Sequence, residues 1–254
     1  ETCFKEIRNV AKKHHAVFVR IRPQLIENEI SLAIFKQNDF IAAPMHLTAD
    51  LTSQLDIRKS EDELLANMRK TTRYELKKAQ KLGIRVETSL NINAITQFYE
   101  LQLETSKRQG FVPFSLPFLR EQFRIFAENN AALLYRAYHE QTLLAEAFVI
   151  FYGQEATYHY GASTDDGRRF PGAYLLQWEA IREAKRRGQK RYNFWGVVKP
   201  DQTQHRFYGV SIFKRGFGGD DVRYVPAQDL VIDPIRYAVN YSVEYLRKKA
   251  RKLG

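Results

Sequence analysis

The chain has 254 residues, enough for one large domain or two modest ones, and it can bury a substantial core. Hydrophobic residues make up 44% and charged residues 27%, which are ordinary values for a soluble globular protein. The single cysteine, Cys3, excludes an internal disulfide framework and fits a reducing compartment. Because no apolar run is long enough to cross a bilayer and the first residues do not resemble a signal peptide, we expect a soluble, cytoplasmic protein.

The formal net charge is +11, from 40 Lys and Arg against 29 Asp and Glu. Such an excess favours a phosphate-bearing partner, which could be a nucleic acid, a nucleotide-linked substrate or an anionic membrane surface. A generally basic, well-solvated surface explains the same number, and charge alone slightly favours that simpler interpretation. The position of the charges along the chain has to separate the two.

The first 57 residues predict a helix, a strand, a short second helix and an extended run. Apolar residues at helical spacing predict the first helix over residues 4–15, and residues 16–22 are typical of a strand that a proline ends. Residues 24–43 offer a short helix and a loop. The extended run that follows ends at Leu55-Asp56-Ile57.

A long basic helix is predicted next, over residues 60–82. Ser60 and Glu63 form a capping box at its start, and Gly83 is a stop signal at its end. Its apolar face consists of Leu64, Leu65, Met68, Tyr74, Leu76 and Ala79. Its other face carries a dense basic stripe of Arg69, Lys70, Arg73, Lys77, Lys78 and Lys81. The stripe is a candidate surface for phosphates, although a solvated helix face is the simpler explanation of any single residue.

The rest of the chain alternates between strands and helices. The expected elements are a strand over 84–88, helices over 93–107 and 115–128, strands over 131–138, 143–152 and 156–161, a helix over 172–187 and a strand over 191–195. Glu140-Gln141 is a plausible hairpin turn, and residues 202–214 finish in a short apolar run that we interpret as a further strand. A final helix begins at Asp233-Pro234 and has Ile235, Val239, Val243 and Leu246 on its apolar face.

The order of elements from residue 84 onward resembles an acetyltransferase-like (GNAT-like) unit, and residues 1–57 resemble the second half of another. We therefore predict an α/β (α+β) fold of tandem GNAT-like units. The first unit is incomplete and comprises residues 1–57 and 231–254. The second unit, with the substrate cleft, takes residues 58–230.

Several kinds of chemistry have no signature in the sequence. Cysteine and histidine residues do not cluster at metal-ligand spacing, so we predict no metal site. No phosphate-binding P-loop, dinucleotide fingerprint or nucleophile elbow is present, so a covalent mechanism has no support.

The turn over residues 168–173 is placed where GNAT enzymes bind a pyrophosphate with backbone amides and a helix N-terminus. Here Phe170-Pro171 stands where glycines are preferred, and a proline lacks the amide donor that an anion needs. An ordinary first turn of a core helix explains the segment equally well. Coenzyme A binding is therefore not supported.

Two glycine-rich strand ends are the best candidate for a site: Tyr192-Asn193-Phe194-Trp195-Gly196 and Phe213-Lys214-Arg215-Gly216-Phe217-Gly218-Gly219. In open α/β sheets such ends form the substrate rim, and a lysine there can neutralise a developing oxyanion. A glycine-rich hairpin with a solvated lysine is the alternative, and the segment alone favours it.

These two segments together resemble the FemABX family of peptidoglycan-bridge aminoacyltransferases. Further segments from residue 16 to the C-terminal helix are similar to that family: Leu55–Ile57, Ser60–Leu65, Met68–Ala79, Gly83-Ile84, Glu104–Phe111 and Tyr158–Ser163. The resemblance implies transfer of an amino acid from aminoacyl-tRNA, as co-substrate and without a cofactor such as coenzyme A, to a stem-peptide amine. The acceptor would be lipid II or a UDP-linked muramyl pentapeptide, with possible contact at the inner membrane face.

The resemblance also assigns residues. Phe213 and Lys214 would be catalytic, with the lysine stabilising the tetrahedral intermediate. Arg108, Tyr160, Trp195 and Gly196 would contact the precursor, although Arg108 could instead be a loop ion-pair partner and Tyr160 a packing aromatic. Contacts with tRNA or phosphate would come from Arg69, Arg73 and Lys77, and further ones from the basic tail over 247–252.

The chain departs from the family in two ways. It begins at Glu1 and lacks a family N-terminal stretch, so we expect either a trimmed chain or a short member, and it has no helix long enough for a coiled-coil arm. Two other functions stay open. One is an acyl-CoA-dependent N-acyltransferase of GNAT type, and the other is a non-enzymatic RNA-binding protein.

Overall fold

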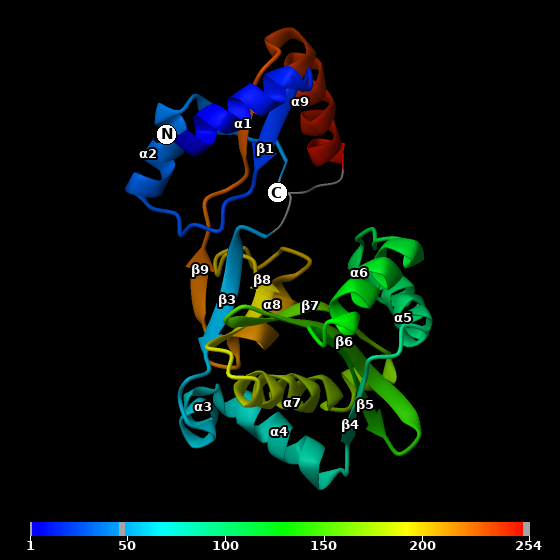
Figure 1. Cartoon of the computed structure of the whole chain (residues 1–254). Coiled ribbons are helices and arrows are strands. Elements are labelled where there is room, and N and C mark those ends of the chain that lie inside the picture. Colours follow the sequence, from blue (N-terminus) through cyan, green and yellow to red (C-terminus); the bar gives the residue numbers. More distant parts are fainter. Residues whose placement is uncertain (1, 46–48, 251–254) are drawn as a thin grey trace. The chain divides into compact units, whose positions relative to one another are not determined.

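The structure, a computed structural model, describes residues 2–45 and 49–250. The chain divides into two compact units, Glu1–Leu51 with Val222–Gly254, and Thr52–Asp221. The sequence predicted the first boundary six residues later, after residue 57, and the second nine residues later, after residue 230. They differ because strand β3 (Leu51–Asp56) belongs to the larger sheet and strand β10 (Gln228–Val231) to the smaller one (Figure 1).

The first unit is built on a three-stranded antiparallel sheet of order β1-β10-β2. Its other elements are α1 (Thr2–Lys13), β1 (Phe18–Ile21), α2 (Glu29–Gln37), β2 (Phe40–Ala42) and α9 (Pro234–Ala250). Phe35, Phe40, Val225 and Leu230 form the buried core on one face. On the other face Asp229 is completely buried, and both oxygens of its carboxylate accept hydrogen bonds from Arg20 at 2.7 Å.

Helix α9 packs on this unit through a different face from the one predicted. The Tyr237 hydroxyl donates a hydrogen bond to Asp229 at 2.8 Å, and its ring meets Phe18 edge-on. The predicted apolar stripe, from Ile235 to Leu246, is exposed instead. Helical periodicity identifies the apolar face of a helix. It does not show that the neighbouring face will pack on the sheet through a hydrogen bond to a buried carboxylate, as Tyr237 does with Asp229.

The second unit contains a seven-stranded sheet of order β4-β5-β6-β7-β8-β3-β9. The strands not yet given are β4 (Arg85–Ser89), β5 (Ala132–His139), β6 (Thr142–Tyr152), β7 (Glu155–Ser163), β8 (Arg191–Gly196) and β9 (Asp220–Arg223). The β7–β8 pair is parallel, and the β5–β6 hairpin turns at Glu140-Gln141 as predicted.

Helices cover both faces of this sheet (Figure 1). On one face α3 (Glu61–Asn67), α4 (Lys70–Lys81) and α7 (Gly172–Arg186) bury the larger core cluster, to which α8 (Tyr208–Arg215) adds Phe213. On the other face α5 (Ala94–Gln109) and α6 (Leu116–Glu128) pack around Phe98, Phe123 and Phe148.

The predicted helix over 60–82 is two helices, α3 and α4, with a break at Met68-Arg69. Met68 has an extended backbone and is buried in the core, and the Arg69 amide donates to the Gly216 carbonyl at 2.9 Å. These tertiary contacts outweigh the helical propensity of the segment. Tyr74, predicted on the apolar face, is 62% exposed.

The strand predicted at the end of residues 202–214 is wrong, because this segment forms helix α8. Phe213 and Phe217 lie four residues apart, so they share one side of the turn and both contact Tyr174. A short apolar run fits a strand and a buried helix equally well, which explains the error.

Candidate active site

The candidate site lies where strands β7 and β8 part. They pair only over their first residues, from Glu155↔Arg191 to Thr157↔Asn193. Beyond this point each strand holds an extra residue. In β7, Val149 of β6 faces Tyr158 and Phe148 faces Tyr160, so His159 forms a bulge. In β8, Asn193 faces Gln54 and Gly196 faces Thr52, and Trp195 takes a left-handed backbone with φ of 64°.

Lys214 extends from helix α8 to the point where β7 and β8 separate. Its Nζ donates a hydrogen bond to the Gly196 carbonyl at 2.7 Å and lies 5.7 Å from the centre of the Tyr158 ring. The residue is only 8% exposed. Within the part of the chain that the structure describes, no carboxylate forms an ion pair with it. The solvated hairpin lysine that the segment alone favoured is therefore not observed.

Burial lowers the pKa of Lys214 from 10.5 to about 7, because an ammonium ion loses its hydration there and gains no countercharge. A lysine in this state carries its proton for part of the time at neutral pH. Its charge is also strongly felt by a nearby group, since little water screens it. The geometry therefore offers a strong hydrogen-bond donor to any negative charge that develops at the strand ends.

Phe213 lies beside Lys214 in the sequence but points into the core. Its ring meets Tyr174 at 4.9 Å and Phe217 at 5.4 Å between centroids. These contacts anchor helix α8 on the sheet, so the role that the geometry gives Phe213 is to hold the lysine in place.

The predicted precursor contacts come from three elements, β7, β8 and α5. The Trp195 ring meets His159 at 5.6 Å between centroids, and His159 meets Tyr160 at 4.2 Å. Arg108, at the end of α5, donates to the Ser163 carbonyl and pairs with Asp165 at 3.3 Å. The structure thus links Trp195 to Tyr160 through His159, and Gly196 to Lys214 through a hydrogen bond, while Arg108 lies at the far end of β7 beside Ser163.

The loop between α5 and α6 contributes side chains to which the sequence assigned no role. Phe114 packs against Tyr160 with 6.0 Å between ring centroids, and Phe111 meets Phe207 at 6.2 Å. Arg206 donates to the Gly110 carbonyl. A Gly-Phe-x-Pro-Phe loop between two helices was visible in the sequence, but nothing local connected it to β7.

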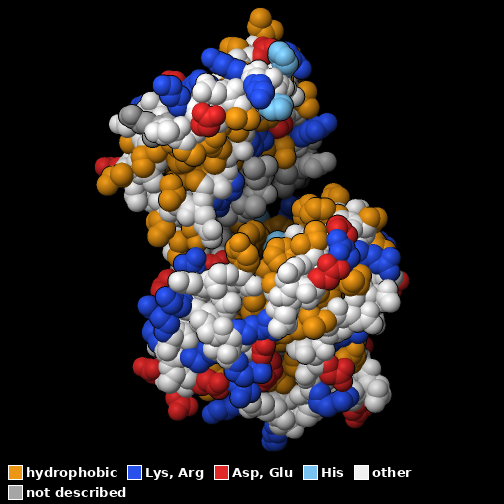
Figure 2. Space-filling view, viewed as in Figure 1, with side chains coloured by type: hydrophobic (Ala, Val, Ile, Leu, Met, Phe, Trp, Pro, Cys, Tyr) orange, Lys and Arg blue, Asp and Glu red, His pale blue; other side chains and the backbone are white. Residues whose placement is uncertain are grey.

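The three predicted phosphate contacts have different surroundings. The Arg73 guanidinium is used inside the protein, since it donates to the carbonyls of Ala66 and Met68 at the end of α3. Arg69 and Lys77 are exposed on the outside of α4. On the face of this unit drawn in Figure 2, Lys and Arg side chains are interspersed with Asp and Glu.

The turn before α7 is filled by contacts with other parts of the protein. A Cβ on Gly167 would lie 1.9 Å from the Leu144 carbonyl oxygen, so this glycine serves a close backbone contact within the protein. Phe170 stacks on His139 with ring centroids 4.6 Å apart, and Pro171 precedes the helix without an amide donor.

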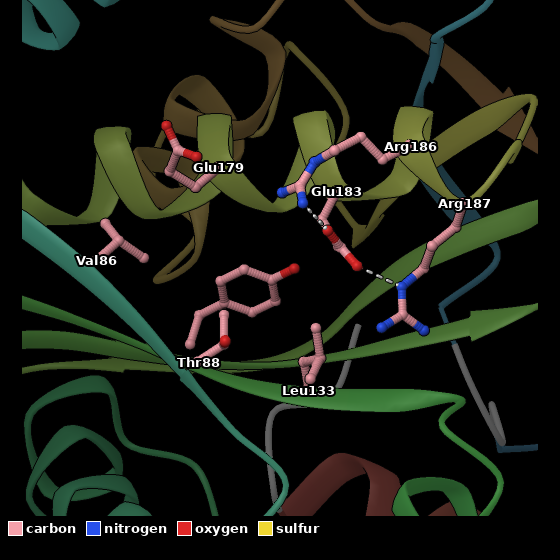
Figure 3. Close-up of a pocket in the computed structure, with 8 residues that line it drawn as sticks. Val86, Thr88, Leu133, Glu179, Glu183, Arg186 and Arg187 are labelled. Atoms are coloured by element: carbon pink, nitrogen blue, oxygen red, sulfur yellow. Dashed lines mark hydrogen bonds and ion pairs between the residues drawn. The ribbon is translucent and has the colours of Figure 1, made fainter.

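A separate cavity of about 440 Å³ lies between α7 and strands β4 and β5 (Figure 3). Glu183 stands at its rim and accepts from Arg186 at 2.8 Å and Arg187 at 2.7 Å. Strands β6 and β7 separate this cavity from β8. Its charged side chains, Glu179, Glu183, Arg186 and Arg187, balance in number, so it lacks the unpaired charge that distinguishes the Lys214 site.

Within residues 2–45 and 49–250, no helix combines the length and apolar character needed to span a bilayer. Nor does any group of three or more His, Cys, Asp or Glu side chains in these ranges come together as metal ligands would.

Comparison with known proteins places the chain. The FemAB family model matches residues 41–138 and 129–245. FemA of Staphylococcus epidermidis is 28% identical over 120 residues, which cover 47% of this chain and 29% of FemA. The lipid II:glycine glycyltransferase of Staphylococcus haemolyticus is 22% identical over 292 residues, covering 86% of this chain and 69% of that protein. The matched segment thus spans well under two thirds of FemA.

Solved structures agree on the fold. The crystal structure of FemX has a TM-score of 0.82 at 18% identity and covers 94% of this chain and 78% of its own. A tandem GNAT protein from the clavulanic acid biosynthesis pathway has a TM-score of 0.53 at 13% identity and covers 88% and 67%. These likenesses confirm the predicted α/β fold of tandem GNAT-like units. Since the family model matches most of its length, the chain belongs to the FemAB family.

Proposed function

We propose that this chain is an aminoacyltransferase that moves an amino acid from aminoacyl-tRNA to the stem-peptide amine of a peptidoglycan precursor. Membership of the FemAB family supports this proposal, as do relatives described as an aminoacyltransferase and a lipid II:glycine glycyltransferase. The observation that carries it is Lys214, a buried lysine without a countercharge at the end of β8.

The reaction needs little more than positioning and charge stabilisation, because an aminoacyl ester is already activated. The acceptor amine attacks the ester carbonyl carbon, a C–N bond forms, and the carbonyl oxygen becomes an oxyanion. One N–H of the Lys214 ammonium is held by the Gly196 carbonyl, which leaves two to stabilise that oxyanion. The C–O bond then breaks, and the tRNA ribose hydroxyl leaves with the proton that the amine loses.

The acceptor would contact the side chains of Trp195, Tyr160 and Arg108. Aromatic rings at Trp195 and Tyr160 offer flat contacts to a peptide, and Arg108 offers a cation whose charge Asp165 only partly offsets. Lipid II and a UDP-linked muramyl pentapeptide both carry such a peptide together with phosphates. If the acceptor is lipid-linked, the protein would work at the inner face of the membrane.

The tRNA would bring phosphates to the exposed side of α4. Lys77 and Arg69 are both exposed there, although the Arg69 Nε donates to the Thr71 hydroxyl at 2.7 Å, whereas Arg73 is engaged with the α3 carbonyls. A coenzyme A donor is less well supported, because the turn before α7 is filled by its own packing and begins the helix with a proline.

The test is transfer of a radiolabelled amino acid from a panel of aminoacyl-tRNAs to UDP-linked pentapeptide and to lipid II. We expect transfer by the wild-type protein and a strong loss in Lys214→Met. Lys190→Met is the matched control, because that lysine is exposed at the opposite end of β8. Transfer from acetyl-CoA instead, or tRNA binding without any transfer, would replace this function with one of its two alternatives.

A further inference from the structure

The backbone of Trp195 is unusual for a large aromatic residue. Its φ of 64° lies in the left-handed region, where a side chain crowds the following carbonyl and glycine is preferred. Such a conformation persists only where the surroundings hold it, and it is enriched at functional sites. The next residue, Gly196, presents the carbonyl that accepts the Lys214 hydrogen bond. The bulge at Trp195 therefore sets the direction of that carbonyl.

The side chain of Asn193 holds this bulge. Its Oδ1 accepts a hydrogen bond from the Trp195 backbone amide at 2.8 Å, two residues along the same strand. Asn193 is almost completely buried, so its side chain has little access to water.

Glu155 in turn fixes the orientation of the asparagine. Its Oε1 accepts from the Asn193 Nδ2 at 3.1 Å and from the Thr157 hydroxyl at 3.1 Å, and its Oε2 accepts from Arg191. Since a carboxylate can only accept here, it turns the amide nitrogen of Asn193 toward itself and the oxygen toward Trp195. The chain of contacts runs without a gap from Arg191 through Glu155, Asn193 and Trp195 to the carbonyl at Lys214.

We propose that Asn193 is a positioning residue of the transfer reaction, which holds the Trp195 bulge so that the Gly196 carbonyl orients the Lys214 ammonium. This inference rests on the proposed function. Asn193 does not touch the reacting atoms, and it acts only through the end of β8. Without it, the Trp195 amide loses its partner and the residue relaxes toward extended backbone, which turns the Gly196 carbonyl away.

A double-mutant cycle tests the proposal. Asn193→Ala is expected to lower kcat about tenfold, the effect of one buried hydrogen bond, and to leave KM within about twofold. Glycine adopts a left-handed backbone without strain, so Trp195→Gly should make the clamp unnecessary, whatever its own effect on activity. We expect Asn193→Ala to cost less than about twofold when it is added to Trp195→Gly. Equal losses in the two backgrounds, or no loss in the wild type, would overturn the role.

A second readout does not depend on activity. Trace labelling of lysines with acetic anhydride, followed by mass spectrometry, gives the pH midpoint at which Lys214 becomes reactive. Loosening the bulge admits water, so Asn193→Ala should raise that midpoint by about one pH unit toward the ordinary lysine pKa. Asn129→Ala, which removes an exposed asparagine at the end of α6, should leave it unchanged. A midpoint unchanged in Asn193→Ala overturns the positioning role, whereas absence of transfer in the wild type overturns only the proposed function.

Discussion

Asp229 in the first unit and Lys214 in the second are both buried charged groups, and their surroundings differ in kind. In the first unit, Asp229 is fully enclosed but accepts two hydrogen bonds from Arg20 and one from Tyr237. In the second unit, Lys214 is nearly as buried and has a single carbonyl as its partner. A fully paired charge is what a stable core requires, whereas an unpaired one is costly and has to be explained by function.

The pKa shifts of Arg20 and Lys214 agree with this contrast. The hydrogen bond to Asp229 raises the pKa of Arg20, which stays charged at any ordinary pH. Burial lowers the pKa of Lys214 to about 7. The first unit therefore keeps a permanent ion pair, and the second keeps a cation that readily gives up its proton.

The largest effect is expected at the paired charge. Asp229→Ala leaves the Arg20 guanidinium buried without its main partner and should lower the free energy of unfolding by about 3–5 kcal/mol. Urea denaturation followed by circular dichroism measures this loss. Glu121→Ala is the control, because it breaks an ion pair with Arg124 on an exposed helix surface and should have little effect. Similar small effects for both variants would remove the contrast between the units.

Replacing the unpaired charge should have the opposite pattern. Lys214→Met should slow transfer about 100- to 1,000-fold, the usual cost of losing one oxyanion donor. The free energy of unfolding should not fall, because methionine fills a similar volume without a buried charge. Single-turnover transfer and urea denaturation of the same preparation give both numbers. A variant that loses activity and stability together would indicate a structural lysine.

The pH dependence of stability sharpens the same point. Between the folded pKa of about 7 and the unfolded value of 10.5, the unfolded chain holds a proton on Lys214 that the folded chain lacks. Lys214 should therefore make the free energy of unfolding rise with pH across this range, by at most about 1.4 kcal/mol per pH unit. The difference between wild type and Lys214→Met, measured at several pH values, isolates this contribution. A difference that does not vary with pH would place the lysine in water.

The smallest expected effects concern two basic residues of α4, Arg73 and Lys77, which should respond differently to replacement by alanine. Arg73→Ala removes hydrogen bonds to the α3 carbonyls and should cost about 1 kcal/mol of unfolding free energy. Lys77→Ala should leave stability unchanged and reduce the salt dependence of tRNA binding by about one phosphate contact. Binding measured over a range of salt concentrations checks the second claim. If Lys77→Ala binds tRNA as the wild type does at every salt concentration, α4 is only a solvated surface.

Local signals predicted much of the fold. The capping box of Ser60 and Glu63 is formed as expected, and the hairpin at Glu140-Gln141 is present. The helices and long strands between residues 84 and 196 lie within a few residues of their predicted ranges. These features depend on neighbours in the sequence, so a sequence pattern is enough to find them.

The site depended on contacts that no local pattern encodes. Helix α3 ends at Met68 because the side chain of Met68 is buried in the core and the backbone amide of Arg69 donates to the Gly216 carbonyl. The left-handed Trp195 is held by Asn193 and Glu155, the latter from another strand. Lys214 was identified by resemblance, but its burial follows from α8 being a helix, which the apolar run alone did not reveal.

The most direct test of a catalytic Lys214 is the pH dependence of single-turnover transfer from aminoacyl-tRNA. Stabilising an oxyanion requires the protonated lysine, whereas the attacking amine becomes more reactive as pH rises in both proteins, so the ratio of the wild-type rate to the Lys214→Met rate isolates the lysine. This ratio should be large below pH 7 and should fall as pH rises above about 7. If the variant matches the wild type in rate and in pH profile, the buried lysine takes no part in the reaction.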